Sequence, residues 1–237
     1  MPGSDVQTVV MMSRSEADPI DDERITRFSR ASRAAHWLNA IGFFVLVSTG
    51  AVMWGAPGTQ WVGYRQVVRN VHFIAGLLVL VPLVVGWLAS RDVRNDVRRL
   101  ARWSLDDRRW WFRSQRRRVR LGKFNPGQKA NAAFTFAALL TLLGTGFMLK
   151  WPDPFGDDLR AGATAVHDWT SYALGLVVIG HIFMALRDRE SLRGMAQGTV
   201  SDSWARTERP RWHAETRASA AATSQTQNDP EVVEIGR

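Results

Sequence analysis

Residues 163–186, ATAVHDWTSYALGLVVIGHIFMAL, form the stretch that most constrains how this chain can fold. The stretch is apolar and long enough to cross a lipid bilayer as a helix. It carries His167 and His181, which are fourteen residues apart. A helix places them on nearly the same face and roughly 21 Å apart along its axis. This helix therefore offers one imidazole near each side of the membrane.

Three further stretches are apolar and long enough to be membrane spans, at about residues 34–54, 71–89 and 130–149. Pro82 lies inside the second of them, where a membrane helix tolerates a kink. Together with residues 163–186, these stretches predict an all-α membrane protein, a bundle of four transmembrane helices.

The polar segments define the expected domain organisation. The membrane domain is predicted to cover residues 27–206, because the spans and the basic segments that flank them lie within these bounds. Residues 1–26 are polar with mixed charge and are expected to form a flexible tail. Residues 207–237 are rich in Ser, Thr, Ala and Gln, so a disordered tail is expected there as well.

The distribution of Lys and Arg predicts the orientation in the membrane. Residues 91–129 hold fourteen of them, and the segments before the first span and at 187–211 are also basic. The loops at 55–69 and 150–163 hold two each. Basic segments stay on the cytoplasmic side, so both termini are predicted to be cytoplasmic. This rule accounts for the net charge of +9, and we expect contact with lipid headgroups and no nucleic-acid partner.

Four of the five histidines lie in the spans, at two depths. His36 and His181 are near the cytoplasmic ends of their spans, whereas His72 and His167 are near the outer ends. A low-spin haem takes one axial ligand on each face, so each haem needs two histidines from different helices. The pattern predicts an inner haem held by the first pair and an outer haem held by the second.

The chain contains no cysteine, which excludes disulfides, iron–sulfur clusters held by this chain and covalently attached c-type haem. A single histidine in a membrane helix is more often a helix contact than a ligand, and His213 in the polar tail is interpreted in that ordinary way. Zinc would need more ligands at one depth. A haem-free anchor and a small metal transporter remain as alternative functions.

Four segments resemble the b-type cytochrome (gamma) subunit of respiratory formate dehydrogenase, and the resemblance covers about residues 24–212. They are RAAHWLNAIGFFVLVSTG in the first span, GKFNPGQKAN before the third, HDWTSYALGLVVIGHIFMAL in the fourth and LRGMAQGTVSDSWA after it. The spacing of the two histidines alone is shared with other dihaem cytochromes b. A cytochrome b subunit of a membrane hydrogenase or of another periplasmic oxidoreductase is therefore an alternative.

The resemblance implies a subunit of the bacterial inner membrane that anchors the complex and holds two b haems, with His36, His72, His167 and His181 as axial ligands. Electrons would come from an iron–sulfur (beta) subunit, supplied by a catalytic molybdenum or tungsten (alpha) subunit. They would reach a quinone, menaquinone or ubiquinone, in anaerobic or formate-dependent respiration. The chain itself shows no molybdenum ligand and no formate site.

The resemblance also implies a quinone site beside the inner haem. The family's quinone contacts match Asn125, Gly127 and His181, with Gln128 and Lys129 beside them. From the residues alone, Asn-Pro-Gly is an ordinary turn that leads into the third span. The resemblance favours the quinone over the turn.

Overall fold

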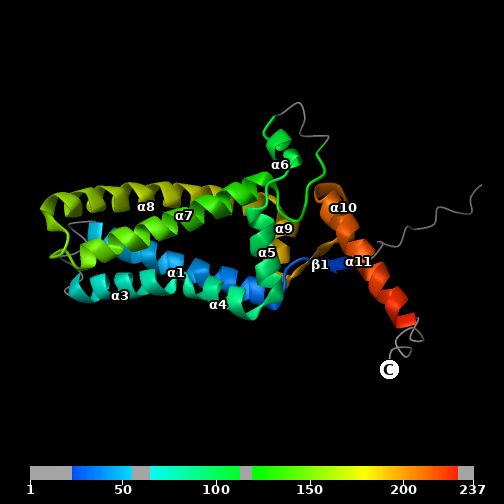
Figure 1. The fold of residues 1–237 in the computed structure, drawn as a ribbon, viewed down its shortest axis with the longest axis horizontal. Helices are drawn as coiled ribbons and strands as arrows, with labels where there is room; N and C mark the ends of the chain where they lie inside the picture. Colours follow the sequence, from blue (N-terminus) through cyan, green and yellow to red (C-terminus); the bar gives the residue numbers. More distant parts are fainter. Residues whose placement is uncertain (1–22, 55–64, 113–118, 229–237) are drawn as a thin grey trace, which may run out of the picture.

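The structure, a computed structural model, describes residues 23–54, 65–112 and 119–228. Four long helical segments lie side by side, and the shorter elements gather at one end of them (Figure 1). The long segments are α1 (Arg30–Trp54), α3 (Arg65–Leu78) followed by α4 (Val81–Ala89), α7 (Pro126–Lys150) and α8 (Gly156–Arg187). Each is long and apolar enough to cross a membrane, so the four predicted spans are found as four candidate membrane helices. The described chain is mostly helical rather than all-α, because it also forms a two-stranded sheet.

The helices begin earlier in the sequence than the apolar stretches that predict them. The second span begins at Arg65 rather than at residue 71, and the fourth begins at Gly156 rather than at residue 163. Hydropathy marks only the part of a helix that lies in hydrocarbon, while polar first turns can continue the same helix into the interface.

The second span is interrupted at Val79 and Leu80, between α3 and α4. Pro82 follows in the first turn of α4. Proline has no N–H to donate, and its ring clashes with the carbonyl four residues earlier. The kink predicted at this position is therefore present as a break in the helix.

The bundle core lies where the interruption faces the other spans. Val79, Ala138, Leu139 and Leu174 are buried together there. Gly42 of α1 makes the close approach possible, because a Cβ at this position would lie 3.3 Å from a methyl group of Val79. Along the bundle, α1 packs against α3 and α4, and α7 packs against α8.

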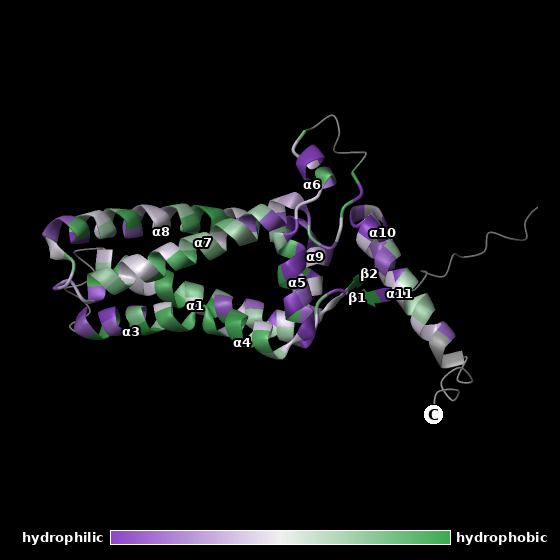
Figure 2. Ribbon diagram, in the orientation of Figure 1, coloured by the Kyte–Doolittle hydropathy of each residue, from purple (hydrophilic) through white to green (hydrophobic). Residues whose placement is uncertain are grey.

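The outer faces of the four long segments are apolar and exposed. Leu176 and Ile179 of α8, for example, have 71% and 67% of their surface accessible. Figure 2 shows hydrophobic residues along these segments and more hydrophilic residues in the elements at the end of the bundle. Exposed apolar faces of this extent are typical of helices that contact lipid.

The shorter elements formed by the described residues lie at one end of the bundle (Figure 1). They are β1 (Arg24–Thr26), α5 (Arg91–Ala101), α6 (Leu105–Trp110), α9 (Arg189–Gln197), β2 (Thr199–Ser201), α10 (Asp202–Glu208) and α11 (Pro210–Asn228). β1 and β2 form an antiparallel pair with Ile25 opposite Val200. Because β1 precedes α1 and β2 follows α8, this pair places both ends of the described chain at the same end of the bundle.

The structure corrects the predicted tails. The disordered tail expected from residue 207 is wrong for Pro210–Asn228, which forms α11. Trp212 of α11 is 5% exposed and packs with Ile25, Val200 and Ala205. The membrane domain thus continues past residue 206 into a helix that covers the small sheet. At the other end, residues 24–26 of the expected flexible tail form β1, while residues 1–22 lie outside the described part.

Candidate functional site

The four histidines of the spans meet in two pairs, one near each end of α8. His36 of α1 faces His181, with ring centroids 6.2 Å apart and ring planes inclined by 60°. His72 of α3 faces His167, with centroids 6.3 Å apart and planes inclined by 57°. These are the two pairs that the depth argument predicts, and α8 contributes one ring to each.

The separation of the rings fits axial ligation of one iron by each pair. With a metal–nitrogen bond of about 2 Å on either side, and about 1 Å from that nitrogen to its ring centre, two such imidazoles have centroids about 6 Å apart. Both observed separations agree with this value. Within the described ranges, no group of three or more His, Asp or Glu side chains is placed to hold a metal ion without a macrocycle.

Small residues allow neighbouring helices to approach the outer pair. A Cβ at Gly50 of α1 would lie 3.5 Å from Cε1 of His72, and a Cβ at Gly146 of α7 would lie 3.7 Å from Cε1 of His167. Each outer ring therefore packs directly against the backbone of a glycine on an adjacent helix.

The residue before each of these glycines is a threonine that contacts the same ring. Thr49 Oγ1 lies 2.8 Å from Nδ1 of His72. Thr145 Oγ1 lies 2.9 Å from Nδ1 of His167. A Thr-Gly dipeptide thus meets each outer ring, from α1 in one case and from α7 in the other.

These threonines favour one tautomer of each outer ring. The hydroxyl of Thr49 is 2.7 Å from the carbonyl oxygen of Val45, and that of Thr145 is 2.8 Å from the carbonyl oxygen of Thr141. A hydroxyl that gives its one proton to such a carbonyl is left to accept from the Nδ1–H of the outer imidazole. The Nε2 lone pair of each outer ring then remains for a metal.

The two threonines were not predicted from the sequence. The available signal was a repeat: the first and third spans each carry Thr-Gly close to their outer end, within STG at 48–50 and GTG at 144–146. The repeat could be interpreted only once the structure showed that a histidine of the following helix faces each Thr-Gly.

The inner pair lies among polar groups, at the end of the bundle where the shorter elements gather. Arg33 and Asn39 stand one turn before and one turn after His36 on α1. The Nε of Arg33 and the Oδ1 of Asn39 are buried and have no hydrogen-bond partner among the described residues. Arg33 Nη1 donates to the Ala196 carbonyl at 2.6 Å, and a Cβ at Gly198 would lie 3.3 Å from Arg33 Nε. Trp37 places its ring 5.5 Å from that of His36 and donates to the Met195 carbonyl of α9.

The segment predicted to bind quinone forms the N-terminus of α7. Asn125 is its N-cap, and its Oδ1 accepts from the N–H of Gln128 at 2.8 Å. Gln128 Oε1 accepts from the N–H of Asn125 at 3.0 Å, which completes a capping box. The amide nitrogens of both side chains take no part in this box. The first turn of α7 is tightly packed at Gly127. A Cβ added there would lie 3.3 Å from Asn125 Oδ1 and 3.6 Å from the ring of Trp110.

Two buried ion pairs fix this segment at both ends. Lys123 donates to Asp96 of α5, and although burial lowers the pKa of Lys123, the carboxylate partly opposes that shift. Lys129 Nζ lies 2.7 Å from Asp107 Oδ2 of α6, and their side chains are 5% and 3% exposed. Lys129 also donates to the Arg102 carbonyl at 2.7 Å. Lys129 therefore links the start of α7 to Asp107 and to the Arg102 carbonyl.

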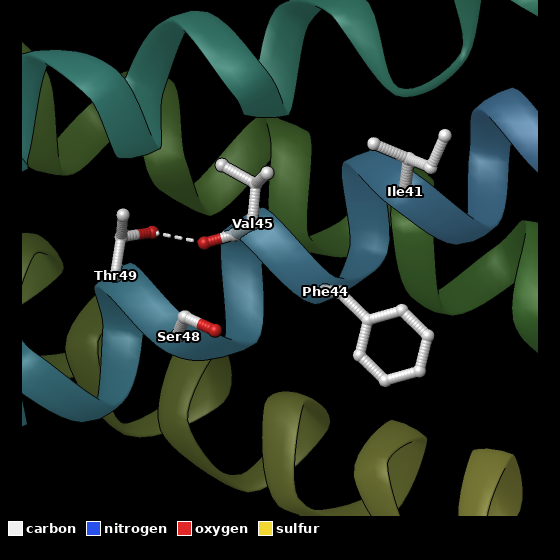
Figure 3. Close-up of a pocket in the computed structure, with 5 residues that line it drawn as sticks. All are labelled: Ile41, Phe44, Val45, Ser48 and Thr49. Carbon is white, nitrogen blue, oxygen red and sulfur yellow. Dashed lines mark hydrogen bonds between the residues drawn. The ribbon is translucent and has the colours of Figure 1, made fainter.

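A shallow pocket of about 400 Å³ lies on α1 (Figure 3). It is lined by Ile41, Phe44, Val45, Ser48 and Thr49. None of the histidine rings lines it, and Ile41 and Phe44 are more than half exposed. The pocket therefore lies mainly on the exposed surface of α1, and it adjoins the outer histidine pair through Thr49, which contacts His72.

The fifth histidine has a structural contact. His213 Nε2 lies 2.7 Å from Asp202 Oδ1, between α11 and α10. This agrees with its interpretation as an ordinary polar contact.

The family model described as prokaryotic cytochrome b561 matches residues 27–198. The formate dehydrogenase cytochrome b556 subunit of Haemophilus influenzae is 27% identical over 213 residues, which cover 85% of this chain and 87% of that protein. The nitrate-inducible formate dehydrogenase cytochrome b556(Fdn) subunit of Escherichia coli is 27% identical over 81% of this chain and 91% of its own length. The cytochrome b556(fdo) subunit of the same organism is 25% identical over 82% and 94%.

Proposed function

The chain belongs to the prokaryotic cytochrome b561 family, and we propose that it is the dihaem cytochrome b subunit of a formate dehydrogenase complex. In this proposal it anchors the complex in the bacterial inner membrane. It receives electrons from an iron–sulfur subunit, itself supplied by a catalytic molybdenum or tungsten subunit, and passes them to a quinone. The relatives named above, which carry formate dehydrogenase in their names, support this choice of complex.

The observation that carries the proposal is the spacing of the two histidine pairs. Both fit an iron between the rings, and they lie at two depths joined by one helix. Haem b, when bound, supplies reversible one-electron transfer. His36 and His181 would hold the inner group, and His72 and His167 the outer one. Arg33, one turn before His36 on α1, would pair with a carboxylate of the inner group.

We further propose that the quinone headgroup meets the capping segment at the start of α7. The amide nitrogens of Asn125 and Gln128 are donors that the capping box leaves available. Gly127 lets a flat ring approach the backbone, and His181 lies on the neighbouring helix. Lys129 positions this segment through Asp107. A quinone reduced here would take its protons from the side where the termini lie, which the distribution of Lys and Arg makes cytoplasmic.

Single histidine substitutions test the haem assignment. His36→Ala and His181→Ala should each remove one haem, and His72→Ala and His167→Ala should each remove the other. His213→Ala is the matched control and should keep both. Pyridine haemochrome assays give the number of haems per chain, and reduced-minus-oxidised spectra identify the one that remains. A chain that binds no haem, or loss of the same haem in His36→Ala and His72→Ala, contradicts the proposal.

Asn125→Ser tests the quinone site separately from folding. Serine keeps a capping oxygen and removes the amide donor, whereas Asn125→Ala removes both. Both haems should remain bound in Asn125→Ser and be reduced by the partner as in the wild type, but their reoxidation by added quinone should be slower. Unchanged reoxidation would leave residues 125–128 with a capping role only.

The partner is tested in native membranes. Formate should reduce the haems of this chain, and the chain should purify together with an iron–sulfur subunit and a molybdenum or tungsten subunit. Reduction by hydrogen and not by formate would assign the chain to a hydrogenase instead.

A further inference from the structure

We infer that Thr49 and Thr145 are positioning residues that lower the reduction potential of the outer haem relative to the inner one. The inference rests on the proposed function, because it needs a haem between His72 and His167. It concerns two side chains that do not touch the iron and act through the rings that would.

Two matched contacts carry the inference. Each outer ring has a threonine oxygen at 2.8 or 2.9 Å from Nδ1. In both cases the hydroxyl lies within donor distance of a backbone carbonyl one turn earlier, which leaves its oxygen to accept from a ring in the Nδ1–H tautomer. His72 has a further hydrogen bond with the Leu46 backbone. The same arrangement occurs twice, from α1 and from α7, on residues that are far apart in the sequence. A chance helix contact at one ring does not account for the second.

The inner pair has no such contact. Among the residues that the structure describes, the rings of His36 and His181 make no hydrogen bond to a hydroxyl, and the aromatic neighbour of His36 is Trp37. The two pairs therefore have nearly equal ring spacing and differ in what the ring nitrogen away from the metal meets.

This difference has a known chemical consequence. When the ring nitrogen that does not bind the metal donates a hydrogen bond, the bond fixes the tautomer of the imidazole and raises the basicity of the ligating nitrogen. A more basic ligand favours ferric over ferrous iron, so it lowers the reduction potential. Both ligands of the outer haem would have such a hydrogen bond. The outer haem should therefore have the lower reduction potential of the two. Electrons that enter at the outer side would then move to the inner haem spontaneously.

Valine substitutions remove the hydroxyls at nearly constant shape. Thr49→Val and Thr145→Val should each raise the reduction potential of the outer haem by up to about 59 mV. For one electron, this corresponds to a tenfold weaker preference for the ferric state. The inner potential should stay in place. Thr141→Val is the matched control, because its hydroxyl donates to the Ala137 carbonyl one turn from Thr145. Redox titration of the purified complex, followed by optical spectra and by the low-spin ferric EPR signal, measures each haem.

Serine variants separate the hydrogen bond from packing. Thr49→Ser keeps the hydroxyl and should keep the wild-type potential and EPR signal. If Thr49→Val loses the outer haem, Thr145→Val tests the potential in its place. An outer potential that does not move in either valine variant, an equal shift of both haems, or failure of serine to restore the signal would overturn it. A wild-type complex without an outer haem would instead refute the proposed function.

Discussion

Replacing Asp107 with asparagine should destabilise the start of α7 far more than the loss of a neighbouring exposed charge does. The carboxylate of Asp107 is 2.7 Å from Lys129 Nζ, and both side chains are almost fully buried. The same carboxylate accepts from the N–H of Ser104 at 2.7 Å and from its hydroxyl at 2.9 Å. Asp107→Asn keeps the shape of the side chain and removes the charge that balances Lys129.

The size of the effect follows from the ammonium that is left behind. Removing one partner of a buried ion pair costs about 3–5 kcal/mol, because the other charge stays buried without compensation. Lys129 keeps its hydrogen bond to the Arg102 carbonyl, so the lower end of that range applies. A loss of about 3 kcal/mol corresponds to roughly a hundredfold change in the folded-to-unfolded ratio.

Asp106→Asn is the matched control for Asp107→Asn. Asp106 is adjacent in α6, and its pair with Arg109 is 3.9 Å long and solvent-exposed, so its loss should cost less than about 0.5 kcal/mol. Urea unfolding of the detergent-solubilised protein, followed by tryptophan fluorescence, compares the two variants. If their unfolding free energies differ by less than about 1 kcal/mol, the assignment of a buried pair is wrong.

The same pair predicts a dependence of stability on pH. Burial opposes the charge of Asp107, but hydrogen bonds from Lys129 and Ser104 outweigh it and lower the pKa of this carboxyl below its usual value. A carboxyl with a lowered folded pKa stabilises the fold above its unfolded pKa of about 3.9, and this contribution is lost as the pH falls through the folded pKa. Below about pH 4 the wild type should therefore lose stability more steeply than Asp107→Asn.

Two further predictions concern a turn and the topology. Gly198 has φ of 96°, so Gly198→Ala should destabilise by about 1–2 kcal/mol, whereas Gly162→Ala, in a helix with open space around the new methyl group, should stabilise by up to about 1 kcal/mol. Equal urea midpoints for the two variants would contradict this contrast. Alkaline phosphatase fused after Arg237 should be inactive and, inserted between residues 151 and 155, active; the reverse result would place both termini outside.

The spans and the pairing of histidines could be predicted because both depend on depth. Hydropathy gives the apolar middle of each span, and the bias of Lys and Arg predicts its direction, so His36 and His181 fall at one level and His72 and His167 at the other. Only four histidines had to be paired, two at each depth. The structure adds the helix faces, which the depth argument leaves open.

The helix at Pro210–Asn228 could not be predicted because its stability comes from distant residues. Its own composition is polar and small, which locally resembles a disordered tail. Trp212 is buried by Ile25 from the start of the chain and by Val200 from the strand after the last span. A contact that joins three distant segments leaves no pattern in any one of them.

Lys129 shows the same limit for a polar residue. Its place at the membrane edge is compatible with a ligand contact, and the resemblance puts it beside the quinone. The structure gives its ammonium two acceptors, Asp107 and the Arg102 carbonyl, both in a segment that the sequence shows only as a basic loop. A charged residue can be located by hydropathy, but its partner depends on how the loop folds back.

In the proposed function, the hydrogen bonds of Thr49 and Thr145 can be compared with the electrical work of electron transfer between the two haems. The histidine levels are roughly 21 Å apart along α8, about two thirds of a 30 Å hydrocarbon core. An electron that moves inward between them works against about two thirds of the membrane potential, roughly 1.5 kcal/mol per 100 mV. A tenfold ferric preference at the outer haem is about 59 mV, or about 1.4 kcal/mol. If the outer potential is lowered by that full amount, the hydrogen bonds from the outer rings to Thr49 and Thr145 would nearly offset the electrical work of that step per 100 mV.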